Sequence, residues 1–134
     1  MFNRLTPYTP HLLAALRIIA ALLFLEHGLN KFLGWPPTPM PRPASIMGLV
    51  GVAAVIETFG SILLALGLFT RPAAFLMSGT MAVAYFLAHA SRSFFPIANG
   101  GEGAILFCFI FLYIAAAGPG AWALDNRRQP NSPP

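Results

Sequence analysis

The stretch of residues 46–69, IMGLVGVAAVIETFGSILLALGLF, decides the fold of this chain. At about 1.5 Å of rise per residue, a helix of this length reaches roughly 36 Å, enough to cross a hydrocarbon core of roughly 30 Å with some tilt. The stretch therefore predicts a transmembrane helix. Its one charged residue is Glu57, and a carboxylate at bilayer depth costs at least about 2.5 kcal/mol on insertion scales. We expect Glu57 to face other protein, to pair with a cation or to be protonated.

The composition places the whole chain in the membrane class. Of its 134 residues, 57% are hydrophobic and only 9% are charged, against about 25% charged residues in soluble proteins. The apolar residues divide into four blocks, so we expect one all-α domain, a bundle of four transmembrane helices. The predicted spans are residues 11–32, 46–69, 72–90 and 101–117, in a domain of residues 11–125 between an N-terminal tail, 1–10, and a polar C-terminal tail, 126–134.

The charges and the single cysteine exclude several classes of protein. The net charge is +4, but the cations never cluster with interleaved aromatic residues, so nucleic acid is not an expected partner. Cys108 alone cannot form an intramolecular disulfide, a Cys-x-x-Cys redox pair or a thiolate metal cluster. Any redox role therefore needs a bound cofactor. Arg17 interrupts the first apolar run, so we expect a permanent span there and not a cleaved signal peptide.

The loops predict an orientation in the membrane. Segment 34–45 carries five prolines and is expected to be an extended connection, because proline cannot continue a helix. Alternating spans place both termini and the turn near residue 71 on one side, and segments 34–45 and 93–101 on the other. The first side holds slightly more Lys and Arg, which favours cytoplasmic termini. The cations compared are Arg4, Arg71, Arg127 and Arg128 against Lys31, Arg42 and Arg92.

Polar residues concentrate in one half of the predicted bundle. Depth and helical periodicity together bring polar groups of all four spans toward one end, which we assign to the outside. Glu57 is the deepest of them, and the opposite half holds mainly Arg17. We expect an outward-opening polar pocket. The candidate residues of a ligand or proton site are Glu57, His27, Lys31, Arg17, His89, Arg92, Glu102 and Asn99.

Each candidate also has a structural interpretation. An ion pair of Glu57 with a cation could merely fix the helix register. His27 and His89 could ligate a metal or a haem, but histidines at a membrane interface more often make ordinary hydrogen bonds, so we expect neither cofactor. Glu102 is most simply a carboxylate at the start of a helix. These alternatives stay open at the level of the sequence.

Short motifs follow one another in a fixed order, and the ordered set is more specific than any one of them. They are Arg17, EHGLNKF at 26–32, ETFG at 57–60, LGLFTRPAA at 66–74, His89, NGGE at 99–102 and GPGAWALD at 118–125. Over about residues 12–125 this set resembles the DoxX family of small bacterial membrane proteins. The chain is also distantly similar to the Surf-type cargo receptors of the eukaryotic secretory membrane, which are not enzymes.

The resemblance implies a four-helix bundle in the bacterial inner membrane and an association with redox chemistry. Some family members are named as subunits of a thiosulfate:quinone oxidoreductase. Cys108, as a lone cysteine, departs from thiol-using relatives and weakens any dithiol mechanism. Carried over onto this sequence, the family's charged core corresponds to Arg17, His27, Lys31, Glu57, His89 and Glu102, with no role assigned to any of them.

We therefore expect a redox-associated inner-membrane subunit that binds a quinone or a small polar ligand, with the lipid bilayer and redox proteins as partners. Glu57 would accept a proton or pair with a cation, Lys31 and Arg92 would attract an anion, and His27 or His89 would bind a quinone carbonyl. Whether it is itself catalytic, and whether it forms a homo-oligomer, stays open. The alternatives are a non-catalytic membrane scaffold or partner-binding protein and, less favoured because no inverted repeat is evident, a proton-coupled transporter.

Overall fold

The structure, a computed structural model, describes residues 2–39, 43 and 45–128, and this part of the chain is all-helical with no strand. The predicted C-terminal tail lies outside the described residues beyond Arg128. The long elements are α1 (Thr9–Leu33), α2 (Leu49–Val55) continued by the π-helical turn η3 (Ile56–Gly60) and α3 (Ser61–Leu66), α4 (Thr70–Ala84) continued by the π-helical turn η4 (Tyr85–His89), and α6 (Glu102–Ala117). The short ones are η1 (Phe2–Arg4), η2 (Thr6–Tyr8), α5 (Pro96–Asn99) and α7 (Asp125–Arg128).

Three helical stretches in the described residues are long and apolar enough to cross a membrane. They are Thr6–Leu33, Leu49–Leu66 and Thr70–His89. The fourth apolar helix, α6, has 16 residues and reaches about 24 Å, less than the ~20 residues of an average span. The all-α fold class is confirmed for the described residues.

Backbone chemistry explains where these helices begin and end. Pro10 lies in the first turn of α1, where its missing N–H costs nothing. α1 ends at Gly34, whose left-handed φ of 70° lets its N–H bond the carbonyl of Asn30 at 2.9 Å. Gly48, with a φ of 65°, delays the next helix to Leu49, three residues after the start of the predicted span. Residues 34–39 form no helix, as their prolines predict.

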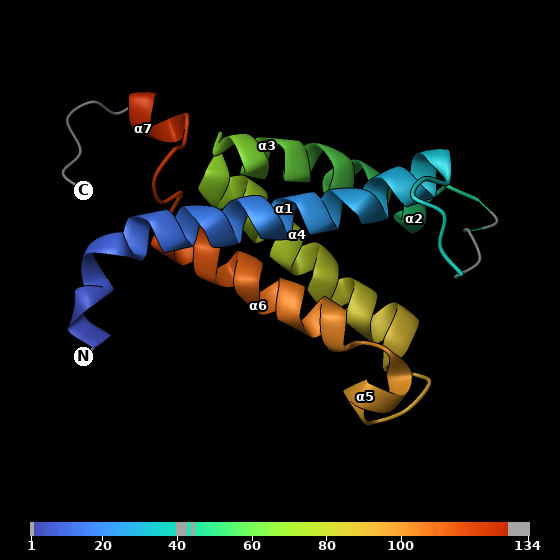
Figure 1. Cartoon of the computed structure of the whole chain (residues 1–134). Helices are drawn as coiled ribbons and strands as arrows, with labels where there is room; N and C mark the ends of the chain where they lie inside the picture. The colour runs from blue at the N-terminus through green and yellow to red at the C-terminus, as the bar shows by residue number, and fades with distance from the viewer. Residues whose placement is uncertain (1, 40–42, 44, 129–134) are drawn as a thin grey trace.

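The helices form two antiparallel pairs that cross each other (Figure 1). α1 packs along α3 and η3, while α4 packs along α6. The start of α1 and the short helix α7 lie at one end of the molecule, which we call the terminal end. The start of α2 and the short helix α5 lie at the opposite end, which we call the loop end, and there the two pairs diverge.

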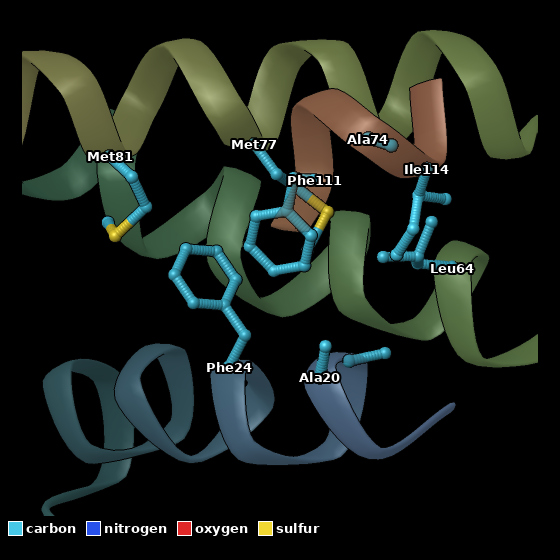
Figure 2. Packing of buried hydrophobic residues seen from close by; sticks show 9 residues of the cluster. Ala20, Phe24, Leu64, Ala74, Met77, Met81, Phe111 and Ile114 are labelled. Carbon is cyan, nitrogen blue, oxygen red and sulfur yellow. The ribbon is translucent and has the colours of Figure 1, made fainter. Parts of the chain in front are cut away.

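The apolar core lies where the pairs cross, and every long helix contributes to it (Figure 2). Phe24 of α1 meets Phe111 of α6 edge to face with ring centroids 4.9 Å apart, and Met77 and Met81 of α4 close over them. Small side chains such as Ala20 and Ala74 let the helices approach. Because a bilayer supplies no hydrophobic drive between helices, this packing is what joins the two pairs.

Candidate functional site

The deepest charged group toward the loop end is Glu57 in η3, which is 1% exposed. Its Oε1 accepts a hydrogen bond from Lys31 Nζ at 2.5 Å, and the Lys31 side chain, in the last turn of α1, is 25% exposed. The structure therefore gives Glu57 the cationic partner Lys31. A buried carboxylate with one half-buried ammonium is an arrangement that a membrane core tolerates only when the charges are paired.

A close approach of two backbones places this pair. Gly28 lies one turn before Lys31, and a Cβ there would come 2.3 Å from Thr58 Oγ1 and 2.8 Å from the Thr58 amide nitrogen. Only a glycine allows α1 to come this near to η3. The π-helical turn of η3 is of the kind that recurs at functional sites. Together these two features fix the depth at which Lys31 meets Glu57.

Several buried oxygens beside the ion pair have no hydrogen-bond partner among the described residues. They are Glu57 Oε2, Thr58 Oγ1 and Ser61 Oγ. Ser61, 1% exposed, follows Glu57 by one helical turn. A carboxylate oxygen accepts two hydrogen bonds, and a buried polar atom left unpaired costs about 1–3 kcal/mol. We call Lys31, Glu57, Thr58 and Ser61 the Glu57 site, and its open acceptors and hydroxyls suit a small polar ligand.

Arg17 does not belong to this group. It is 0% exposed and lies toward the terminal end, where its Nη1 donates to the carbonyls of Leu64 at 2.6 Å and Ala65 at 2.8 Å. Its Nε donates to Pro119 O at 2.8 Å and its Nη2 to Ala121 O at 3.2 Å. The last carbonyls of α3 carry the negative end of the helix dipole, and the carbonyl of Leu64 accepts the Gly67 N–H in addition to the guanidinium of Arg17. Arg17 therefore ties α1 to the ends of α3 and α6.

Asn99 and His89 form a separate group that closes the loop between η4 and α6. The Asn99 side chain, in a residue 2% exposed, donates from Nδ2 to Ser93 O at 3.0 Å and to Tyr85 Oη at 3.3 Å. Its Oδ1 accepts the Gly101 N–H at 2.7 Å, and its carbonyl lies 3.1 Å from His89 Nδ1. All partners come from residues 85–101, so this polar group is built within one hairpin.

The remaining candidates lie on exposed surfaces. His27 packs beside Phe24 and Phe107 with ring centroids 6.1 Å from each. Arg92 and Glu102 are exposed and form no ion pair with another described residue. Within residues 2–39, 43 and 45–128 no group of three His, Cys, Asp or Glu side chains could hold a metal ion.

Thr58 and Ser61 belong to the Glu57 site but are not among the residues predicted for it from the sequence. Both hydroxyls lie within one helical turn of Glu57, and that spacing on one helix was the available signal. Lys31 and Glu57 come together, as do His89 and Asn99, but these two pairs belong to different helix pairs. The candidate set is thus divided into an ion-pair site on α1 and η3, a loop closure and a tie at the terminal end.

Long apolar helices around buried polar groups define a small integral membrane protein. The family model described as DoxX matches residues 12–90. An "uncharacterized protein" of Haemophilus influenzae is 50% identical over 129 residues, covering 93% of this chain and 96% of the relative. The inner membrane protein YphA of Escherichia coli K12 is 32% identical over 137 residues, covering 88% and 91%. The chain belongs to the DoxX family, and no solved structure matches it significantly.

Proposed function

We propose that this chain is a multi-pass protein of the bacterial inner membrane that binds a quinone or quinol head group at the Glu57 site, as part of a redox-associated assembly. The observation that carries the proposal is the buried Oε2 of Glu57, which has no hydrogen-bond partner among the described residues, together with the buried Ser61 hydroxyl four residues further along the same helix. A quinol hydroxyl can donate to that oxygen. A quinone carbonyl can accept from the hydroxyl of Ser61 or from the ammonium of Lys31.

An apolar groove on the same two helices supports a lipid-soluble ligand. The groove has a volume of about 430 Å³ and is lined by Phe32 of α1 and by Val52, Val55 and Ile56 of α2 and η3. Phe32 and Ile56 neighbour Lys31 and Glu57 in the sequence. A quinone carries a polar ring on an apolar tail, and this groove, whose lining does not include Lys31 or Glu57, offers a surface for the tail. Redox partners supply or take the electrons, because Cys108 is a lone thiol.

We count α6 as the fourth span and place both termini in the cytoplasm. Two antiparallel pairs with the start of α1 and the helix α7 at one end of the molecule need an even number of crossings (Figure 1). A helix of 16 residues crosses a bilayer when the bilayer thins locally. The exposed apolar residues Phe94, Phe95 and Ile97 before α6 lengthen its apolar surface. The excess of arginines at the terminal end supports cytoplasmic termini.

The test compares bound quinone in Glu57→Gln and in the matched control Glu26→Gln, which changes an exposed carboxylate of the same helix pair. Protein is purified from bacterial membranes in mild detergent, and quinones are extracted and measured by mass spectrometry. We expect wild type and Glu26→Gln to retain the same quinone content. Glu57→Gln should retain about tenfold less or lower, because a hydrogen bond to a charged group contributes about 1.5–3 kcal/mol. Equal quinone content in all three proteins, or none in the wild type, contradicts the proposal.

A non-catalytic scaffold is the second candidate, and the structural roles of Arg17 and Asn99 favour it. Arg17 donates four hydrogen bonds to backbone carbonyls of other segments, and the Asn99 side chain bonds Tyr85, Ser93 and Gly101 within its own hairpin. Both buried polar groups therefore stabilise the fold. If Glu57 likewise only stabilises the helix packing, Glu57→Gln should lower the midpoint of unfolding and leave the amount of bound quinone unchanged. Loss of ligand from a Glu57→Gln protein of unchanged stability excludes the scaffold.

A further inference from the structure

A second cavity lies at the terminal end, away from the Glu57 site. Its volume is about 820 Å³, and it is lined by the start of α1, the start of α4, the end of α6 and the segment that leads to α7. Leu13, Pro72 and Ala117 give it apolar walls, whereas Arg71 and Asp125 give it one charge of each sign. These two opposite charges line the same cavity, yet they form no ion pair with each other within 4.0 Å.

Asp125 keeps hydrogen-bonding capacity for a cation. Its Oδ1 accepts the Phe69 N–H and its Oδ2 the Thr70 N–H, both at 2.9 Å, which uses two of about four lone-pair positions. Partial burial acts to raise the pKa of this carboxyl, but the Thr70 amide and hydroxyl, the Phe69 amide and the charge of Arg128 hold the pKa below its ordinary value. Asp125 is therefore an anion at neutral pH. Arg128 itself lies over the Phe69 ring, 4.7 Å from the centroid.

Arg71 keeps donors for an anion. Its Nη1 donates to Ala115 O at 2.9 Å and to Ala116 O at 2.5 Å, which anchors the guanidinium on the last turn of α6. Among the described residues nothing accepts from its Nε or Nη2. These atoms lie over Gly118, where a Cβ would come 3.0 Å from Nη2. An anchored guanidinium with a free N–H edge has the geometry that binds phosphate.

Thr70 also lines this cavity and supports the negative charge of Asp125. It is 0% exposed, and its backbone amide and its side-chain hydroxyl both act to lower the pKa of the Asp125 carboxyl. The cavity also lies at interfacial depth, because α4 begins and α6 ends there. The exposed Trp122, packed edge-on against His11 with centroids 5.2 Å apart, is a typical interfacial aromatic at this level. Polar head groups of lipids lie at this depth.

We propose that this cavity binds a zwitterionic phosphate–amine group, with the phosphate on Arg71 and the ammonium on Asp125. Phosphatidylethanolamine carries this group at the membrane surface, and phosphoethanolamine carries it in water. The apolar walls favour the lipid, since Leu13 and Ala117 can contact its glycerol and upper acyl carbons. The proposal stands apart from the Glu57 site, which is at the other end of the bundle.

The test is native mass spectrometry of delipidated protein in detergent with equimolar phosphatidylethanolamine and phosphatidylglycerol. We expect wild type to retain phosphatidylethanolamine about tenfold better than phosphatidylglycerol, since only the former brings an ammonium to Asp125. Asp125→Asn should remove this preference, and Arg71→Gln should weaken both lipids. Ala117→Trp changes an exposed wall residue and fills the cavity without touching its charges, so it should lower retention of both lipids. Arg127→Gln, outside the cavity, is the control.

The outcomes separate the source of the group and can overturn the proposal. Displacement of the lipid by millimolar phosphoethanolamine assigns the site to the soluble compound, and failure of phosphoethanolamine to compete assigns it to the lipid. Equal retention of both lipids by the wild type, or unchanged lipid retention in Ala117→Trp, overturns the proposal. Ala117→Trp leaves the hydrogen bonds at the helix ends intact. Lipid retention in this variant therefore tests the proposal even if Arg71→Gln does not fold. Size-exclusion chromatography and circular dichroism check the fold of each variant.

Discussion

Replacement of Arg17 by methionine should unfold the terminal end of the bundle. The guanidinium donates four hydrogen bonds, of which three are 2.8 Å or shorter. A hydrogen bond to a charged group contributes about 1.5–3 kcal/mol, so the short ones together contribute about 4.5–9 kcal/mol. Burial of the guanidinium costs several kcal/mol in return. We therefore expect Arg17→Met to lower the free energy of unfolding by about 3–5 kcal/mol, and Arg17→Lys by about 2 kcal/mol, because a single ammonium cannot reach all these carbonyls.

The assay is reversible unfolding in mixed micelles, followed by circular dichroism as the fraction of dodecyl sulfate rises. Arg127→Met is the matched control, because Arg127 is an exposed arginine at the same end of the molecule, and it should change the unfolding free energy by less than about 0.5 kcal/mol. If Arg17→Met unfolds within about 1 kcal/mol of the wild type, the hydrogen bonds of Arg17 do not hold the helix ends together and the reasoning fails.

Two further predictions use the same unfolding assay. Gly28→Ala should lower the free energy of unfolding by about 1–3 kcal/mol, because the added Cβ would come 2.3 Å from Thr58 Oγ1. The control is Gly103→Ala, whose Cβ would have no described atom within 4 Å, and it should leave the stability unchanged or raise it slightly. Equal effects of the two substitutions would contradict the close approach of α1 and η3. The lowered pKa of Asp125 means that its contribution to stability is complete above the ordinary carboxyl pKa of about 3.9 and is lost as the pH falls through the lower folded-state value. Between pH 6 and pH 3 the wild type should thus lose more stability than Asp125→Asn, and parallel curves for the two proteins would contradict this role.

The helices and their buried faces could be predicted from the sequence because both are local properties. Long apolar runs predict spans. At about 100° per residue, the first span turns Phe24, Gly28 and Lys31 to the side of Arg17, and the structure buries this face except for Lys31, whose side chain is 25% exposed. The start of the second long helix was less predictable. Gly48 adopts a left-handed φ, a backbone choice that hydropathy does not report.

The partner of Glu57 could not be chosen from the sequence. Periodicity gives the direction of a side chain but not the relative height of two helices, so the sequence leaves open which cation pairs with Glu57. The height is set by the contact between Gly28 and Thr58. The acceptors of Arg17 could not be predicted either, because they are backbone carbonyls. Every residue has a backbone carbonyl, so the residue type does not indicate which one accepts the bond.

The grouping of the polar residues at the loop end could not be predicted from the sequence either. Their depth and periodicity predict that polar groups of all four spans meet in one pocket. In the structure Asn99 bonds within residues 85–101, because a side-chain amide close to its own loop finds backbone partners there at little entropic cost. Glu57 and Lys31 meet on the other helix pair. The two π-helical turns, η3 and η4, have no signature in hydropathy or composition.

The tie made by Arg17 also sets an order for biogenesis. Two of its four acceptors, the carbonyls of Pro119 and Ala121, lie 102 and 104 residues later in the chain, and the Leu124 amide bonds Leu66 O in the same region. The first helix is therefore synthesised about a hundred residues before these two acceptors of its arginine. A chain cut before residue 119 lacks both acceptors and leaves this charge with fewer partners inside the membrane.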